Sequence, residues 1–382
     1  MNIAIPTDGR LPRRLRPYMR STMISSRPAA DSPMNEDEAP AVIVYRRLVV
    51  RRRLMIALAA TAAIVAFGLD VCLGPSGLGL AAVLRGLTDP ASMTRSASVV
   101  LFDLRLPAAT LAVLVGLSLS LAGAEMQTIL NNPLASPFTL GLSSAATFGA
   151  ALGIVLDVAL PGLPPTWGIP LCAFAMALLA SGALFFLSHV KGAAGQTLLL
   201  FGIALFFTFN ALVALLQFVA SEQALQQLVF WTLGSLSRAS WDKIVLLMCI
   251  FGATAAFSFA ASWKLTALRL GEDRAASLGV DVEWLRWASF MRVSLLTAAA
   301  VSFVGTIGFI GLVAPHIARL LVGEDHRFFL PMSALCGSLV MSLAAIAAKM
   351  LVPGVVLPIG IVTALAGIPI FFSLILMRSN LR

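Results

Sequence analysis

The sequence predicts an all-α membrane protein with about ten transmembrane helices, and its composition and pattern support this fold class. Hydrophobic residues make up 59% of the 382 residues, whereas charged residues make up only 12%, about half the share usual for a soluble domain. The mean hydropathy is +0.93. Apolar runs that could cross a bilayer, which takes about 20 helical residues, recur along the chain. We therefore expect one integral membrane domain rather than two globular domains.

The apolar runs give nine clear spans and one short segment. In chain order the clear spans are Leu54–Leu73, Ala97–Leu130, Leu140–Val158, Trp167–His189, Thr197–Val219, Lys243–Ala261, Trp287–Val304, Phe328–Leu351 and Leu357–Met377. Leu312–Leu321 is too short to cross on its own. We expect a partial helix there, and it brings the number of crossings to ten.

Residues 1–53 differ in composition from the rest of the chain. They are rich in Arg, Pro, Ser and Asp, with an acidic patch at Glu36–Glu38 and a basic run at Arg51–Arg53. No apolar run follows the first basic residues, so this segment is not an ordinary cleavable signal peptide. We predict a disordered, basic cytoplasmic tail at 1–53, followed by an integral membrane domain at 54–382.

The net charge of +9 would suggest nucleic-acid binding in a soluble protein. Here the Arg residues gather in the tail and the short loops, where they set topology and contact anionic lipid, so we exclude a nucleic-acid partner. The basic segments should face the cytoplasm together with both termini, which leaves Arg85 and Arg238 outside. These cytoplasmic segments are 1–53, 131–139, 190–196, 262–286, 322–327 and 378–382.

Titratable and metal-binding side chains are sparse within the spans. The four Cys and three His residues are scattered and form no CxxC or Cys/His cluster, so we expect neither a disulfide framework nor a metal site. The acids Asp70, Asp103, Asp157 and Asp242 all fall near span ends. A proton- or sodium-coupled carrier normally buries an ionisable residue along its path, so this pattern argues against secondary transport.

The stretch Gly305–Arg319 is unusual for a plain lipid-facing helix. It carries three glycines at a spacing of three, followed by Pro315 and His316. Glycines let backbones approach closely, and Pro315 disfavours helix at the residue before it. We therefore expect a broken helix that lines a cavity or belongs to a moving part.

Two further patterns concern the internal organisation of the chain. Arg105-Leu-Pro opens one long span and Arg292 opens a later one, and the two units run in opposite directions, as in the inverted repeats of transporters.

The residue pattern of the loop 262–286 predicts two short helical pieces separated by Gly279. They share an apolar face of Leu268, Leu270, Ala275 and Leu278. Such a face suits either the membrane surface or a groove on a partner.

Several motifs, in this order, resemble those of the FecCD family of ABC importer permeases, and the resemblance covers about residues 54–380. The matching segments are Arg105–Pro107, Gln127, Asn132–Pro137, Gly271–Gly279, Gly305–Arg319, Asp325–Arg327 and Leu357–Pro369. The resemblance implies a type II ABC importer permease with ten helices per subunit. It also implies a second permease subunit, two ATPase subunits and a periplasmic or lipoprotein solute-binding protein.

The sequence lacks an ATP-binding motif, which predicts that another chain hydrolyses ATP. The chain has no GxxxxGK[ST] phosphate-binding loop, and its nearest candidate, Gly192–Thr197, lacks the Lys. We therefore expect no enzyme activity and no cofactor on this chain, with ATP and magnesium held by the partner ATPase. The resemblance identifies residues 265–280 of the loop 262–286 as a pair of coupling helices that dock into the ATPase, which favours the partner groove over the membrane surface.

The resemblance also assigns residues to three sites. The ATPase-coupling residues are Gly271, Glu272, Ala275, Leu278 and Gly279; the cytoplasmic gate residues are Asn132, Leu134, Gly195 and Gln196; the residues that dock the binding protein are Arg105 and Lys349. The outer surface has fewer charges than usual for the family, because Ala108, Ala345 and Val356 stand where charged residues are common.

The resemblance implies import of a metal chelate across the cytoplasmic (inner) membrane, with a ferric siderophore as the first choice of cargo and haem or cobalamin as alternatives. Two classes outside the family remain as remote alternatives. One is a secondary carrier. The other is an intramembrane serine hydrolase, in which Gly141–Ser144 would act with His189 or His316; no oxyanion element accompanies this pair.

Overall fold

The helices of the chain follow its apolar runs. The computed structural model describes residues 38–75, 77–158, 161–190 and 195–379, and within these ranges every regular element is helical. The longer helices, in order, are α1 (Glu38–Cys72), α4 (Leu106–Ile129), α5 (Leu142–Val155), α6 (Gly168–Val190), α7 (Gly195–Val219), α9 (Trp241–Ala260), α12 (Val282–Val304), α13 (Ile310–Val322), α14 (His326–Met350) and α15 (Ile359–Ser379).

Short helices fill the connections between them. They are α2 (Leu80–Thr88), η2 (Pro90–Ser92), α3 (Arg95–Ser98), the π-helical η3 (Val99–Arg105), η4 (Pro165–Trp167), α8 (Glu222–Thr232), η5 (Leu236–Arg238), α10 (Ser262–Leu268) and α11 (Glu272–Ser277). In the described residues, seven helical segments are long and apolar enough to cross a membrane, and three shorter apolar helices accompany them. Together they correspond to the ten predicted spans, so the predicted fold class is confirmed.

The predicted boundary of the tail needs a correction. Helix α1 begins at Glu38, so residues 38–53 are helical rather than disordered. The predicted span that begins at Leu54 continues the same helix. The part of the tail at 1–37 lies outside the described residues. The described residues divide into two compact units between Val49 and Val50, and the second unit carries the sites discussed below.

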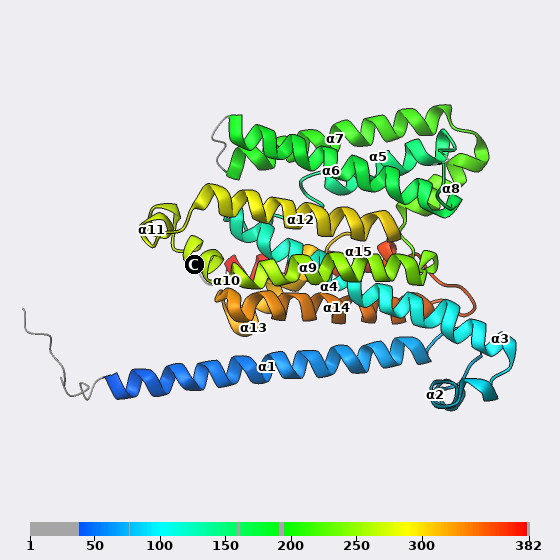
Figure 1. Cartoon of the computed structure of the whole chain (residues 1–382), viewed down its shortest axis with the longest axis horizontal. Coiled ribbons are helices and arrows are strands. Elements are labelled where there is room, and N and C mark those ends of the chain that lie inside the picture. The colour runs from blue at the N-terminus through cyan, green and yellow to red at the C-terminus, as the bar shows by residue number, and fades with distance from the viewer. Residues whose placement is uncertain (1–37, 76, 159–160, 191–194, 380–382) are drawn as a thin grey trace, which may run out of the picture. The chain divides into compact units, whose positions relative to one another are not determined.

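Helix α4 is at the centre of the second unit. Nearly all of its residues are buried, and it packs most extensively on α14 and also on α12 and α13. In Figure 1, α5, α6 and α7 lie together on one side of α12, and α4, α13 and α14 lie on its other side. Glycines set the close contacts: Gly116 of α4 faces the backbone of Gly337 in α14, so that a Cβ at either position would overlap the other helix.

The Gly305–Arg319 stretch is broken, but at a different place from the one predicted. Gly305 ends α12 with a φ of 85°, and Phe309, with a φ of 66°, precedes α13. Pro315 then lies inside α13 without ending it. The carbonyl that Pro315 cannot bond belongs to Gly311, four residues earlier, and this carbonyl lies directly against Gly123 of α4. The close helix contact therefore accommodates the proline.

Candidate functional site

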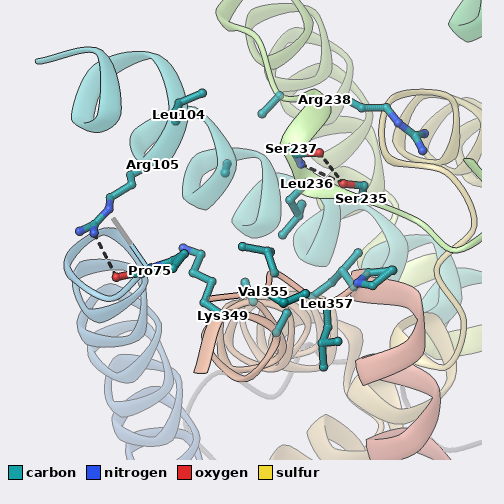
Figure 2. Close-up of a pocket in the computed structure, with 18 of the residues that line it drawn as sticks. Pro75, Leu104, Arg105, Ser235, Leu236, Ser237, Arg238, Lys349, Val355 and Leu357 are labelled. Atoms are coloured by element: carbon teal, nitrogen blue, oxygen red, sulfur yellow. Dashed lines mark hydrogen bonds between the residues drawn. The ribbon is translucent and has the colours of Figure 1, made fainter. Parts of the chain in front are cut away.

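A pocket of about 680 Å³ opens at one end of the helix bundle, where α1 and α14 end and α4 begins. Its lining is mostly apolar, with Asp103, Arg105, Arg238 and Lys349 among the charged members. Figure 2 shows Arg105 and Lys349 on one side of the pocket and Arg238 across from them. All four lie in segments predicted to be on or near the outer side of the membrane.

Arg105 is directed into the protein. Its side chain is only 6% exposed, and its Nη1 donates to the carbonyl oxygens of Cys72 at 2.8 Å, Val71 at 3.2 Å and Leu78 at 3.3 Å. Its Nη2 donates to the carbonyl of Gly74 at 3.4 Å. The guanidinium thereby binds the end of α1 and the loop that follows it to the start of α4. A docking role for Arg105 stays a prediction, and the structure gives this side chain a structural role as well.

Lys349 has an internal partner too. Its Nζ donates to the side-chain Oδ1 and to the backbone carbonyl of Asp70, both at 2.8 Å, and Asp70 is fully buried. Sequence reasoning placed Asp70 at a span end but did not pair it with Lys349. The available signal was that an acid and a Lys each stand near the outer end of their spans. The docking role of Lys349 likewise stays a prediction.

At the opposite end of the bundle, the loop 262–286 forms the two short helices that were predicted. They are α10 and α11, but the bend between them lies at Gly271, with a φ of 106°, whereas Gly279, with a φ of 81°, follows α11. The predicted bend at Gly279 is therefore wrong. The reason is that two glycines in this loop have positive φ, and the sequence does not show which one separates the short helices.

The predicted apolar face of this loop is divided between two sides. Leu268 and Ala275 are buried against the bundle, whereas Leu270 and Leu278 are 56% and 59% exposed. Glu272, another predicted coupling residue, forms an ion pair with Arg286. The exposed leucines leave an apolar surface that a partner could cover, while the buried pair anchors the loop to the bundle.

The predicted gate segment follows α4 directly. Asn131 is left-handed, with a φ of 45°, and the Oδ1 of Asn132 accepts a hydrogen bond from the backbone N–H of Leu134 at 2.9 Å. The Leu134 side chain is 47% exposed. Gly195 and Gln196 begin α7, and their side chains fall outside the described residues. The gate roles of these four residues stay predictions.

A charged network lies between the loop 262–286 and the gate segment, and sequence reasoning did not find it. Arg269, which follows α10, forms a bidentate ion pair with Glu324 and also contacts Asn131. Glu324 also pairs with Arg319 at 3.2 Å. In the sequence Arg269 was one of several basic loop residues, and nothing local distinguishes it from the others.

Neighbouring residues hold the loop between α13 and α14. Asp325 caps α14 and pairs with Arg327 and Arg52. Burial raises the pKa of the Asp325 carboxyl, but its hydrogen bonds to Arg327 and the charges of Arg327 and Arg52 outweigh this and lower the pKa below its ordinary value. The carboxylate is therefore charged at neutral pH.

Glu125 and Arg292 form a buried ion pair within the membrane-spanning bundle. Nη2 of Arg292 lies 2.7 Å from Oε2 of Glu125 and 2.8 Å from Oγ of Ser289, and Glu125 is 1% exposed. Sequence reasoning overlooked Glu125, which lies near the end of α4 at Ile129. One expectation is corrected here: Arg292 lies inside α12 rather than opening it, because α12 begins at Val282 behind the cap of Asp281. The pair does not line the outer pocket.

Comparisons with known proteins agree with this arrangement. The sequence profile of the FecCD transport family matches residues 62–378. The hemin transport system permease protein HmuU of Yersinia pestis is 36% identical over 280 residues, which cover 73% of this chain and 84% of that protein. The vitamin B12 import system permease protein BtuC of Vibrio parahaemolyticus is 35% identical over 283 residues, which cover 74% and 84%.

A solved structure also resembles this fold. It is described as an inward-facing conformation of a transporter of the metal-chelate ABC type. The two chains superpose with a TM-score of 0.75 at 29% sequence identity, and the match covers 85% of this chain and 99% of the other.

Proposed function

Because the chain belongs to the FecCD transport family, we propose that it is the permease subunit of an ATP-driven importer whose cargo is a ferric siderophore. The observation that carries this proposal is the family match over residues 62–378. The placement of the two sites supports it, since the outer pocket and the loop 262–286 lie at opposite ends of the same bundle. A transport subunit needs contacts with a cargo supplier at one end and with an ATPase at the other.

The permease forms no covalent bonds in this proposal. A solute-binding protein delivers the chelate at the outer pocket, and a second permease subunit completes the path. Two ATPase subunits, which hold ATP and magnesium, dock on α10 and α11. Binding and hydrolysis of ATP shift the permease between two states only as far as the partners interact differently with each state. The metal would travel within its chelate, without ligands from this chain.

Haem and cobalamin are the second candidates for the cargo. Proteins named for hemin and for vitamin B12 transport are 36% and 35% identical to this chain, so overall identity does not favour either one. The apolar lining of the outer pocket leaves few polar groups to select a cargo, and selection rests mainly with the binding protein.

Uptake assays test this proposal. Cells that lack their own chelate importers would express the permease, its ATPase and its binding protein, and would be given a hydroxamate siderophore loaded with radioactive iron, labelled haem or labelled cobalamin. We expect accumulation of the siderophore iron, and no accumulation when the ATPase carries a substitution of its phosphate-binding Lys. Accumulation of haem or cobalamin alone would show that this compound, and not the siderophore, is the cargo. Uptake that persists without ATPase activity would contradict the proposed function as an ATP-driven importer.

We also propose an orientation in the inner membrane, with both termini in the cytoplasm. The ion pair between Arg269 and Glu324 joins the loop 262–286 to residues 322–327, so the basic residues of both segments lie at one end of the bundle, as those of cytoplasmic segments should. A membrane-impermeant thiol reagent added to intact cells should label cysteines placed at positions 85 and 238 but not at 274, in a protein whose four native cysteines have been replaced. Labelling at position 274 would reverse the orientation.

A further inference from the structure

We infer that Arg269 is a positioning residue that links the ATPase-docking helices α10 and α11 to the cytoplasmic gate segment at 131–134. The inference rests on the proposed function, because it assigns a route for coupling within the importer. It starts from one side chain that contacts two other elements at the same end of the bundle. These elements are the gate segment, at Asn131, and the loop between α13 and α14.

The guanidinium of Arg269 uses all three of its nitrogen atoms in these contacts. Nε and Nη2 donate to the two carboxylate oxygens of Glu324, at 3.2 and 2.6 Å, and Nη1 donates to the Oδ1 of Asn131 at 2.7 Å. A planar guanidinium that is engaged on both edges fixes the direction as well as the distance of its partners. A displacement of α10 therefore moves Glu324 and Asn131 together.

Asn131 is the residue through which such a displacement would reach the gate. The backbone φ of Asn131 is 45°, which is uncommon for a residue other than glycine. The hydrogen bond from Arg269 to the Asn131 side chain stabilises this backbone conformation. The next residue, Asn132, accepts the hydrogen bond from the N–H of Leu134. The gate segment thus begins at Asn131, and a hydrogen bond from the docking loop stabilises the unusual backbone conformation of this residue.

Glu324 extends the contact to α13 and α4. Its Oε1 also lies 3.2 Å from Nε of Arg319, whose Nη2 donates to the Oε1 of Gln127 at 3.0 Å. A second link runs parallel to this one: the Nε2 of His326 lies 2.8 Å from Oγ1 of Thr128, and the N–H of His326 donates to Oγ1 of Thr266 at 3.0 Å. The end of α4 is therefore connected to α10 on two sides. Arg269 contacts a side chain of the gate segment directly, whereas the His326 link reaches this segment through the backbone hydrogen bond from the N–H of Asn131 to the carbonyl of Thr128.

Other basic residues of the loop do not make such a link among the described residues. Arg286 pairs with Glu272, which belongs to the same loop. Lys264, on α10 itself, lies 6.0 Å from the ring of its neighbour Trp263. The control is Arg53→Gln, at an exposed position of α1 outside the ATPase-docking helices, since it removes one positive charge without touching the network.

The test measures the conformation of the gate segment with a spin label at position 134. A nitroxide label at position 134, in a permease whose native cysteines have been replaced, would be observed by electron paramagnetic resonance in the complete complex with its ATPase subunits, with and without ATP and magnesium. We expect the nucleotide to change the ratio of two spectral components in the otherwise wild-type protein. Arg269→Gln should reduce this change by about 5- to 150-fold, the range typical of coupling between sites, while Arg53→Gln preserves it.

Substitutions at Asn131 keep the test valid if Arg269→Gln fails to fold. Asn131→Gly removes the acceptor but adopts a positive φ without strain, and should reduce the change, whereas Asn131→Asp retains an acceptor and should preserve it. The double variant Arg269→Gln with Asn131→Gly should show no greater loss than Arg269→Gln alone, since residues in one network are not additive.

The outcomes separate this inference from the proposed function. Loss of the nucleotide response in Arg269→Gln and Asn131→Gly, while the ATPase stays bound and active, supports the inference. A normal response in both variants overturns the inference and leaves the importer assignment intact, as does a complex that binds its ATPase yet shows no response at position 134. A wild-type chain that binds no ATPase subunit overturns the proposed function and the inference with it.

Discussion

The ammonium group of Lys349 lies 2.8 Å from the carboxylate of Asp70, and this contact joins α14 to α1 beside the outer pocket. Both side chains are largely withdrawn from solvent, and Asp70 is fully buried. A buried charge is costly when its partner is removed, because it then keeps its desolvation penalty without the compensating attraction. The pair therefore fixes the end of α1 as well as contributing charge to the pocket.

The first prediction concerns this pair. Lys349→Ala should lower the free energy of unfolding by about 3–5 kcal/mol, because it leaves the Asp70 carboxylate buried and unpaired. The double variant Asp70→Asn with Lys349→Met should recover most of the loss, and Arg95→Ala at an exposed position of α3 serves as the control. Chemical unfolding in mixed micelles measures these differences. If Lys349→Ala is as stable as Arg95→Ala, the contact does not hold α1 to α14.

The second prediction concerns the contact between α4 and α14. Gly116→Ala should destabilise the protein by about 1–3 kcal/mol, because a Cβ at this position would overlap the backbone of Gly337. Gly182→Ala in α6 is the matched control, since no atom lies within 4 Å of the position of its Cβ. The melting temperatures of the two variants are compared in the same detergent, and that of Gly116→Ala should be lower. Equal melting temperatures would mean that α4 and α14 can separate without cost.

The sequence was sufficient to predict the number and order of the spans, because each one needs its own run of apolar residues. Contacts between distant residues were not accessible in the same way. Glu125 and Arg292 are 167 positions apart, and each one alone resembles an ordinary polar residue near a span end. Their partnership depends on the rotation of α4 relative to α12, which the hydrophobic pattern of two mostly buried helices leaves open.

In the docking loop, too, the sequence could not predict a structural detail, although the residues involved lie close together in the chain. The positive φ of Gly271 and Gly279 was foreseeable from their positions, but the loop could bend at either residue. The structure distinguishes them through hydrogen bonding: the N–H of Val280 bonds to the carbonyl of Ala275, which makes Gly279 the helix-ending residue of α11 in a Schellman arrangement. Gly271, with a φ of 106° and a ψ of 154°, makes the sharper turn between α10 and α11.

The third prediction follows from this difference. Asparagine tolerates the left-handed conformation that ends helices, so Gly279→Asn should retain most of the uptake. Gly271 occupies a region that is almost restricted to glycine and costs other residues about 1–3 kcal/mol, so Gly271→Asn should reduce uptake per ATP hydrolysed. Both variants would be compared in proteoliposomes with the ATPase bound. Equal coupling ratios in the two variants would contradict the assignment of the bend to Gly271.

The fourth prediction concerns docking of the binding protein. Arg105 and Lys349 already have partners inside the permease, so their replacement should act mainly on stability. For Arg105→Gln we expect a loss of about 1.5–3 kcal/mol in the free energy of unfolding, the range for hydrogen bonds to a charged group. Arg85 and Arg95, in α2 and α3, are exposed, and are free to meet carboxylates on a partner.

Charges at the rim of an interface act mainly on the association rate and on its dependence on salt. The double variant Arg85→Glu with Arg95→Glu should therefore slow association of the binding protein by about tenfold at low ionic strength. Raising the salt concentration should lower the rate of the wild-type permease more than the rate of the variant. Surface plasmon resonance with the permease in nanodiscs measures both effects. If Arg105→Gln slows association while its melting temperature is unchanged, and the Arg85 and Arg95 variant does not, the docking surface lies at Arg105, as the family resemblance implies.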